Sequence, residues 1–472
     1  MTLMGRLFLL TLFLTGSVAM AAPRTNVLLI VVDDLNTHLG CYGNPTVQSP
    51  NLDRLAARGV RFDRAYCQYA LCNPSRVSLL SGRRPEAGGV YDLKVKPREA
   101  FPAAVLLPQV FHQNGFFCAG AGKVYHARSH QDALSWDIYS DGDGEDDGEN
   151  AALKDRYKAG NGTPKPWVLE SDGSRTRDGL NVRTIAKHLA ECADRGTPFF
   201  LAAGLHKPHL PGTAPRRFYD LYPASSLPAF EEPAMEKVPP IALQTELSGF
   251  AAPESRASAV SGYYACISFT DENVGLLLEV LDQRNLWATT LVVLVSDNGF
   301  HLGDHQGLWS KLTTFENGTR VPLLMAGAGI PKGRVVRQPV ELLDVYPTIV
   351  ELAGLPVPEG LEGKSLVPAI LGREENREAR AFSMIYHYDP AADADVLGRS
   401  VRTEGFRYTE WSDTSRELYV ATEGEYANRA GEPSVSGLEE EGARHLRAHI
   451  QPKPGNPNRP RALERGGRPG KE

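Results

Sequence analysis

Apolar residues occur along the chain in two kinds of pattern. Residues 26–32, 199–203 and 291–295 are short, nearly continuous apolar runs, which are typical of strands buried on both faces of a sheet. Between residues 274 and 281, apolar side chains recur at helical spacing instead. Strand and helix patterns alternate over most of the chain, so we predict an α/β fold.

Another helix is predicted to start at Pro50. Ser49 is a typical N-cap residue, and proline is favoured in the first position of a helix. The apolar face of this helix would comprise Leu52, Leu55 and Ala56. Gly59 would end it.

Polar side chains follow three of the apolar runs at their carboxyl ends. These residues are Asp33 and Asp34 after the first run, His206 and His209 after the second, and Asp297 and Asn298 after the third. Because ligand-binding groups in open α/β sheets lie beyond the carboxyl ends of strands, we expect these segments to meet at one site. Carboxylate and amide oxygens suit calcium or magnesium and not zinc. Asp33-Asp34 alone would equally fit a helix cap or a solvated turn, but the second polar pair at another strand end favours a metal site.

Length and composition narrow the class of protein. The chain has 472 residues, of which 42% are hydrophobic and 23% charged, enough for one large domain and a smaller one. The formal net charge is −6, and no clustered basic face indicates nucleic-acid binding.

The two ends of the chain differ from the rest. Residues 1–22 combine a basic Arg6, an apolar run at 7–14 and a small-residue cleavage pattern at 19–21, as in a secretory signal peptide. The apolar run is too short to span a bilayer, so we expect a secreted or periplasmic protein without a stable membrane anchor, an uncleaved anchor being the alternative. Residues 451–472 are rich in Pro, Gly and Arg and are expected to form a disordered tail.

The intervening chain is predicted to contain two units. Residues 23–375 would form the main domain, in which the acidic stretch at 141–150 does not fit a calcium-binding loop and is interpreted as a solvated insertion. Residues 376–450 would form a small subdomain with short strands around Tyr386, Tyr408 and Trp411.

Cys72 stands in the most distinctive motif. It precedes Pro74, which favours helix initiation, so its thiol would lie at a helix N-terminus, where a negative charge is stabilised. From the residues alone, a reactive thiol and a half-cystine, paired for example with Cys67, are equally acceptable. The chain has six cysteines, so at least one stays unpaired within the chain if Cys72 is consumed by chemistry.

The run Cys72-Asn73-Pro74-Ser75-Arg76, followed by Leu80-Ser81-Gly82-Arg83, resembles the signature of type I sulfatases. The resemblance extends from residue 26 to about residue 420. It implies that a formylglycine-generating enzyme oxidises Cys72 to formylglycine, which disfavours the half-cystine. It also implies an alkaline-phosphatase-like fold, with a large mixed sheet between helices and a smaller antiparallel sheet near the C-terminus.

Three further runs are similar to the iduronate-2-sulfatase branch of that family. They are residues 122–126 (Gly-Lys-Val-Tyr-His), residues 206–211 (His-Lys-Pro-His-Leu-Pro), and residues 296–299 (Ser-Asp-Asn-Gly) leading to Trp-Ser-Lys at 309–311. Two positions depart from the pattern. Asn298 stands where the lysosomal enzyme has histidine, although asparagine is common there in the family. After Glu417-Leu418-Tyr419, the frequent Asp-Pro-x-Glu is missing, which affects the small subdomain and not the site.

The resemblance implies a metal-assisted reaction. The ligands would be Asp33, Asp34, Cys72 as formylglycine, Asp297 and Asn298, with Ca²⁺ favoured over Mg²⁺. The hydrated aldehyde would attack sulfur with help from Asp297, and His126 would take a proton when the aldehyde re-forms and sulfate leaves.

Four basic residues complete the implied site. Arg76 and Lys123 would hold the hydrated aldehyde. His209 and Lys311 would bind sulfate oxygens, and one of them would protonate the leaving oxygen. Taken singly, each lysine or histidine would pass for a surface charge or a packing residue, and only the combined motifs favour the site.

The roles of His206 and of Asp304-His305 stay open at this point. The function predicted from the resemblance is hydrolysis of a sulfate ester on a sulfated carbohydrate, such as a glycosaminoglycan. A phosphodiester or phosphonate monoester hydrolase of the same superfamily is the alternative enzyme, and an inactive glycan-binding homologue is the alternative from another class.

Overall fold

The computed structural model describes residues 24–141, 167–227, 232–245, 253–373 and 379–449. The predicted signal peptide, nearly all of the acidic stretch, the domain boundary at 375 and the predicted tail lie outside these residues.

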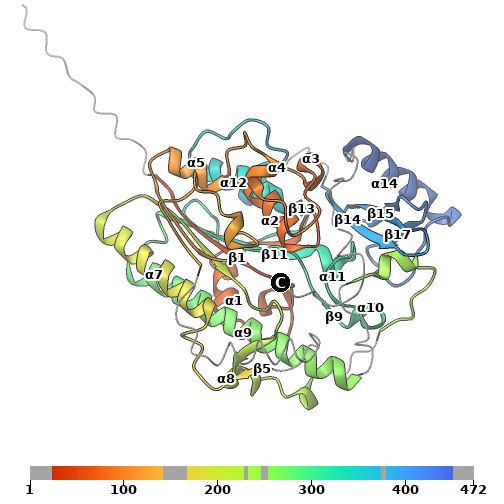
Figure 1. Ribbon diagram of the computed structural model, residues 1–472, viewed down its shortest axis with the longest axis horizontal. Coiled ribbons are helices and arrows are strands. Elements are labelled where there is room, and N and C mark those ends of the chain that lie inside the picture. Colours follow the sequence, from red (N-terminus) through yellow and green to blue (C-terminus); the bar gives the residue numbers. More distant parts are fainter. Residues whose placement is uncertain (1–23, 142–166, 228–231, 246–252, 374–378, 450–472) are drawn as a thin grey trace, which may run out of the picture.

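A nine-stranded mixed sheet forms the centre of the molecule (Figure 1). Its order is β12 (Arg334–Val336), β2 (Gly59–Tyr66), β11 (Arg320–Gly327), β8 (Thr290–Ser296), β1 (Asn26–Val32), β6 (Phe199–Leu205), β3 (Phe117–Gly122) and β4 (Ile138–Ser140), with β13 (Val340–Glu341) also paired to β2. All pairs are parallel except those that β11 makes with β2 and β8. The three apolar runs are confirmed as strands, and they are neighbours in the order β8-β1-β6.

The alternation of side chains along β1 explains why these runs are apolar throughout. Val27, Leu29 and Val31 belong to one hydrophobic core, whereas the intervening residues belong to the other. Successive side chains of a strand point to opposite faces of its sheet, and both faces are covered here.

Helices cover both faces. The first core lies under α2 (Cys72–Ser81), α5 (Leu107–Gln113) and α12 (Val345–Leu352); the second lies under α1 (Pro50–Ala57), α7 (Arg177–Arg195) and α9 (Pro253–Gln283) (Figure 1). The fold is therefore an α/β/α sandwich. The helix pattern at 274–281 is confirmed within α9.

The predicted helix at Pro50 exists, but its two ends differ from the prediction. Gly59 is the first residue of β2 and not a helix stop. The Ser49 side chain does not cap the helix; it accepts a hydrogen bond from the backbone of Gly40. Instead, the carboxylate of Asp271 on α9 accepts from the backbone amide of Leu52 at 2.8 Å, so a residue distant in sequence does the capping.

A second sheet lies at the C-terminal side, as expected. Its four antiparallel strands are β14 (Ala381–Asp389), β15 (Ala394–Arg402), β16 (Phe406–Trp411) and β17 (Arg416–Val420), and α14 (Ser436–His449) packs on it. The amide of Met384 on β14 donates to the carbonyl of Gln68, so this sheet contacts the segment that leads into Cys72.

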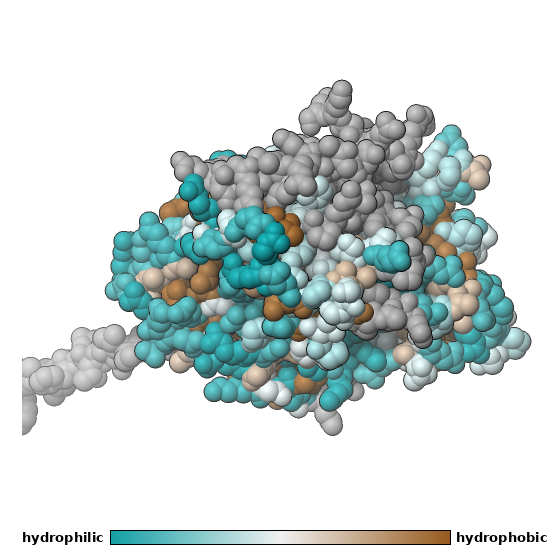
Figure 2. Space-filling model, turned by 90° about the horizontal axis from the view of Figure 1, so that it is seen from below, coloured by the Kyte–Doolittle hydropathy of each residue, from teal (hydrophilic) through white to brown (hydrophobic). Residues whose placement is uncertain are grey.

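The remaining α-helices and strands are short. They are α3 (Pro85–Gly88), α4 (Pro97–Ala100), α8 (Arg216–Tyr219), α10 (Asp304–Gly307), α11 (Glu316–Thr319), α13 (Val367–Leu371), β5 (Trp167–Leu169), β7 (Thr213–Pro215), β9 (His301–Leu302) and β10 (Trp309–Ser310). Within the described ranges, no helix is long and apolar enough to cross a membrane. Figure 2 shows a mainly hydrophilic surface on the face viewed there, with apolar residues in small patches.

Candidate active site

The polar residues that follow β1 and β8 lie side by side at one edge of the main sheet. Val32 and Ser296 are in register at the ends of these parallel strands, which places Asp33 and Asp34 next to Asp297. The three carboxylates are almost fully buried, and one oxygen from each lies within 4.8 Å of the others. Sequence reasoning expected this convergence from strand ends alone.

Arg76 ties this acidic cluster to α2. Its Nε donates to Asp297 at 2.8 Å and one Nη donates to Asp33 at 3.1 Å, while the other Nη donates to the backbone carbonyl of Lys123. Arg76 is one helical turn beyond Cys72, so both side chains lie on the same face of α2. The fork of a buried arginine thus fixes the position of Cys72 relative to the carboxylates.

Two lysines approach the sulfur of Cys72. Lys311 Nζ lies 2.9 Å and Lys123 Nζ 3.9 Å from Sγ. The same two ammonium groups donate to Asp34 and Asp33, respectively. Burial alone would lower the pKa of Lys123, but Asp33 and Cys72 together outweigh burial and raise the pKa, so this ammonium group is charged.

The thiol of Cys72 is not activated by its helix, contrary to the expectation from its N-terminal position. Burial, with the nearby charge of Asp33, raises the pKa of Cys72 well above its usual value despite the two lysines. At neutral pH the side chain is therefore a protonated thiol and a poor nucleophile. The half-cystine alternative is also wrong in this structure, because all six cysteines, Cys67 included, are free thiols.

The residues beside Cys72 fit a hard divalent cation. Asn298 is fully buried, and its Oδ1 has no hydrogen-bond partner among the described residues, whereas its Nδ2 donates to Asp34 at 2.8 Å. Burial, together with Asp33 and Asp34, raises the pKa of Asp297 to about 7 against the opposing charge of Arg76. Crowded carboxylates and an unsatisfied amide oxygen form an all-oxygen donor set of the kind that calcium and magnesium prefer.

Two of the predicted histidines border this cluster. His209 Nε2 is 3.8 Å from a carboxylate oxygen of Asp34, and its Nδ1 is 2.7 Å from the carbonyl of Leu210. Burial lowers the pKa of His209 to about 4 and that of His126 to about 3, so both rings are neutral at pH 7. His126 Nδ1 is buried with no hydrogen-bond partner in the described part of the chain.

His206 is not part of this cluster. Its ring and its backbone amide both bond to the carboxylate of Asp178, which lies in the first turn of α7. Sequence reasoning missed Asp178, because a single aspartate near the start of a helix is an ordinary helix-end residue and carries no motif.

Asp304 and His305, whose roles the sequence left open, belong to a second buried cluster with His301. The carboxylate of Asp304 is hydrogen-bonded to both imidazoles and to the amide of Leu302, and His301 Nε2 lies 2.7 Å from the hydroxyl of Thr313. These bonds connect the segments on either side of Lys311. The cluster therefore positions the Lys311 loop.

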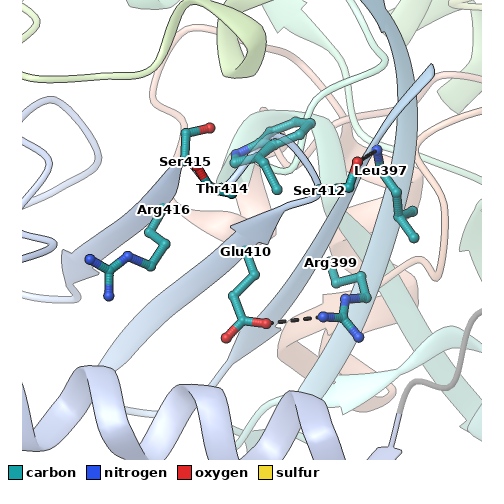
Figure 3. Close-up of a pocket in the computed structure, with 8 residues that line it drawn as sticks. Leu397, Arg399, Glu410, Ser412, Thr414, Ser415 and Arg416 are labelled. Atoms are coloured by element: carbon teal, nitrogen blue, oxygen red, sulfur yellow. Dashed lines mark hydrogen bonds and ion pairs between the residues drawn. The ribbon is translucent and has the colours of Figure 1, made fainter. Parts of the chain in front are cut away.

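A shallow cavity of about 330 Å³ lies elsewhere, on the small sheet (Figure 3). Leu397, Arg399, Glu410, Trp411, Ser412, Thr414, Ser415 and Arg416 line it. Arg399 is paired with Glu410 at 3.0 Å, as drawn in Figure 3, and Arg416 with Glu439. None of the predicted site residues lines this cavity.

The fold and this site define a class of protein: a hydrolase with an α/β/α sandwich, in which an acidic cluster at the strand ends lies beside a cysteine at the start of a helix. Family models agree. The model described as "Sulfatase" matches residues 25–355, and the model described as "N-sulphoglucosamine sulphohydrolase, C-terminal" matches residues 303–446. The chain belongs to the sulfatase family, and it is an enzyme of that family.

Individual relatives agree with this assignment. A sulfatase of Formosa agariphila is 32% identical over 426 residues, which covers 84% of this chain and 80% of the relative. Iduronate 2-sulfatase of Homo sapiens is 30% identical over 476 residues, covering 84% of this chain and 86% of the human protein. The resemblance to the iduronate-2-sulfatase branch is therefore confirmed as similarity across most of both chains.

Solved structures confirm the fold. The phosphonate monoester hydrolase of Agrobacterium radiobacter superposes with a TM-score of 0.75 at 20% identity, covering 90% of this chain and 95% of that one. A protein solved in complex with its substrate D-glucosamine-2-N,6-O-disulfate gives a TM-score of 0.73 at 21% identity, covering 90% and 97%. The alkaline-phosphatase-like architecture expected from the sequence is thus confirmed.

Proposed function

We propose that this sulfatase removes sulfate from a sulfated carbohydrate, using formylglycine derived from Cys72 and a calcium ion. The observation that carries the proposal is the surroundings of Cys72, a neutral thiol that two ammonium groups approach beside three buried carboxylates. Such a thiol is a poor nucleophile, whereas its surroundings are built to hold an anion and a cation. The relatives with carbohydrate substrates in their names support the substrate class.

The proposed calcium ligands are Asp33, Asp34, Asp297 and Asn298, together with residue 72. A bound cation would neutralise the negative oxygens of a sulfate ester, which otherwise repel a nucleophile. The unpartnered Oδ1 of Asn298 supports this assignment, since a buried amide oxygen without a partner is unfavourable. Magnesium is the less favoured ion, because it demands stricter octahedral geometry and keeps more of its water.

The hydrated aldehyde of formylglycine would supply an oxygen nucleophile in place of the thiol. Around it, Lys123 and Arg76 are proposed to hold residue 72, and Lys311 and His209 to bind the sulfate oxygens. His126 is proposed to take a proton as sulfate departs, since its buried Nδ1 has no hydrogen-bond partner among the described residues. Lys311 would donate the proton to the leaving alcohol, because the His209 ring is neutral at pH 7; such a proton donor contributes about 10²–10⁴-fold.

Peptide mass spectrometry across Cys72 tests the proposal. Protein from a host that contains a formylglycine-generating enzyme should carry a peptide about 18 Da lighter than the unmodified thiol, as conversion of cysteine to the aldehyde requires. The same protein should release sulfate from sulfated saccharides, and the Cys72→Ala variant should not. An unmodified Cys72 in that host would contradict the proposal and favour an inactive glycan-binding protein.

A second assay separates the sulfatase from the phosphonate monoester hydrolases with which it shares its fold. With nitrophenyl esters of sulfate and of phenylphosphonate, we expect kcat/KM to be higher for the sulfate. A preference for the phosphonate would assign the chain to the alternative chemistry.

Maturation and location follow from the same proposal. A formylglycine-generating enzyme would be a transient partner, and the sequence of residues 1–22 supports a secreted or periplasmic enzyme. The domain limits of 23–375 and 376–450 likewise stay proposals, which limited proteolysis can test.

A further inference from the structure

A chain of three polar side chains leads from α7 to the loop that carries His209. Asp178 Oδ1 lies 3.1 Å from His206 Nδ1, and His206 Nε2 lies 3.3 Å from a terminal nitrogen of Arg177. Asp178 is buried, His206 is partly exposed, and the side chain of Arg177 is 46% exposed. The exposed end of this chain of bonds is therefore a guanidinium group.

The hydrogen bonds fix the state of His206. Asp178 is an acceptor, so Nδ1 carries the proton, and Nε2 is left to accept from Arg177, which can only donate. Burial lowers the pKa of His206, which agrees with a neutral ring. The backbone amides of His206 and Lys207 also donate to Asp178 at 2.8 Å, so the loop itself is fixed to α7.

The hydrogen-bonded chain Asp178–His206–Arg177 borders the proposed sulfate site. The amide of His209 donates to the carbonyl of His206 in a tight turn, and His209 Nε2 is close to Asp34. On the other side, His206 is close enough to Lys123 for the lysine's charge to lower the pKa of its ring. Arg177 is thus linked through His206 to the turn that carries His209.

The guanidinium of Arg177 has N–H donors left over that can bind a ligand. Its only charged neighbour among the described residues is Asp141, whose nearest oxygen is 3.7 Å away, beyond hydrogen-bond distance. A guanidinium has five N–H donors arranged as a planar fork, and His206 takes one of them. The remaining donors match the paired oxygens of a carboxylate or a sulfate.

We infer that Arg177, positioned by His206 and Asp178, binds a second anionic group of the substrate, either the carboxylate of a uronic acid or a second sulfate. The inference rests on the proposed function and specifies its substrate as a saccharide with at least two anionic groups. A neutral imidazole suits the position between Asp178 and Arg177, because a protonated His206 ring could no longer accept a hydrogen bond at Nε2 and would repel the guanidinium.

Calorimetric binding to the full-length Cys72→Ala protein, which lacks the proposed nucleophile, tests this inference. The probes are a disaccharide with a sulfated uronic acid, its carboxyl-reduced analogue, and a disulfated glucosamine. Arg177→Met is introduced into this background, with Arg183→Met as the matched control. Arg183 is an exposed residue farther along the same helix, and its hydrogen bonds within the described residues go to backbone carbonyls near its own helix start.

We expect Arg177→Met to weaken binding of the uronate about tenfold and to leave the carboxyl-reduced analogue much less affected, because one charge-assisted hydrogen-bonded pair is lost. Arg183→Met should leave the ratio of the two affinities unchanged. Selective loss with the disulfated glucosamine instead would identify a second sulfate as the ligand of Arg177.

Equal weakening of charged and reduced probes would show that Arg177 acts through the His206 loop and would overturn the inference, as would an unchanged affinity for all probes. Failure of the Cys72→Ala protein to bind any probe would count against both the substrate class and the inference. If the wild-type protein lacked formylglycine but the probes still bound in an Arg177-dependent way, the proposed reaction would be contradicted and the inference about Arg177 would stand.

Discussion

The side chain at position 72 is surrounded by charges yet is itself neutral. Burial and Asp33 favour the protonated thiol, and two neighbouring lysines do not reverse this. In a cysteine protease the effect is the opposite, because a partner residue lowers the pKa of the catalytic thiol. The surroundings of Cys72 therefore suit an oxygen nucleophile and an anionic substrate better than they suit thiol chemistry.

Calcium should stabilise the folded protein through Asn298. At a free calcium concentration a hundred times the dissociation constant, binding to the folded state alone adds about 2.7 kcal/mol to the free energy of unfolding. Thermal unfolding after chelation and after addition of calcium measures this effect. Asn298→Leu should abolish the calcium-dependent rise in Tm, whereas Asp413→Asn, at an exposed turn, should retain it. An identical Tm with and without calcium would contradict the assignment.

Replacing Lys311 should lower turnover strongly. Lys311→Met removes an ammonium group from beside Sγ of residue 72 and from Asp34, so we expect kcat to fall about 10²–10³-fold, as when a donor to a developing negative charge is lost. Steady-state kinetics with nitrophenyl sulfate measure the change. Lys332→Met, at an exposed loop position, is the control. A kcat within a factor of two of wild type would rule out the proposed role.

At the scale of elements, the position of Lys123 depends on the close approach of β3 and β6. A Cβ on Gly204 would lie 2.1 Å from the carbonyl carbon of Lys123 and 2.3 Å from the amide nitrogen of Val124. These are backbone atoms, so the strands would have to separate. A glycine at this point of β6 is what allows Lys123 to reach Asp33.

Gly204→Ala should therefore lower both activity and stability. We expect the free energy of unfolding to fall by about 1–3 kcal/mol, as for other overpacked sites, and kcat to fall because Lys123 moves. Urea unfolding and kinetics on the same preparation measure both quantities. Gly405→Ala, where an added Cβ meets nothing within 4 Å, should change neither. Full activity in Gly204→Ala would show that Lys123 tolerates displacement.

The sequence could predict features that depend on local apolar patterning, but not those that depend on contacts between distant segments. The strands at 26–32 and 291–295 and the meeting of their polar ends followed from apolar patterning, because a strand buried on both faces leaves little ambiguity. Asp178 and Asp271 escaped prediction, since each acts on a backbone segment distant in sequence and no local pattern marks such a partner. The helix-end position suggested a stabilised thiolate at Cys72 as one of two open alternatives, but burial raises the pKa of this thiol, and the sequence pattern does not reveal that burial.

Across the whole molecule, buried ion pairs connect the small sheet to the Lys311 segment. Arg407 on β16 is 1% exposed and bonds to Glu417, to Glu425 and to the hydroxyl of Thr314. Glu425 in turn accepts from the amide of Glu316 at the start of α11. The C-terminal sheet thus supports the loop from which Lys311 reaches the site.

Removing Arg407 should destabilise the protein and change its response to acid. Arg407→Met leaves two buried carboxylates short of a partner, so we expect a loss of about 3–5 kcal/mol at pH 7. Burial alone would raise the pKa of Glu425, but Arg402 and Arg407 outweigh it and hold the pKa well below its usual value. A depressed pKa adds stability above the ordinary glutamate pKa of about 4.3, and this stability is lost as the pH falls further.

The difference between wild type and Arg407→Met should accordingly shrink from pH 7 to below pH 4, because a protonated Glu425 needs no cation. Urea unfolding at several pH values measures it. Arg429→Met removes partly exposed pairs with Glu423 and Glu432 and should cost at most about 1 kcal/mol. A difference that stays constant with pH would mean that Arg407 acts through packing alone.

The burial of α2 has a consequence for the order of events during biosynthesis. Every residue of this helix is buried, and the Cys72 side chain lies under Lys311 from a distant part of the chain. An enzyme that oxidised Cys72, as proposed, would need access to this side chain, which the finished fold does not offer. The proposed oxidation would then have to precede folding, and the yield of active protein would depend on the relative rates of oxidation and folding of the nascent chain. Faster folding would lower the yield of working molecules.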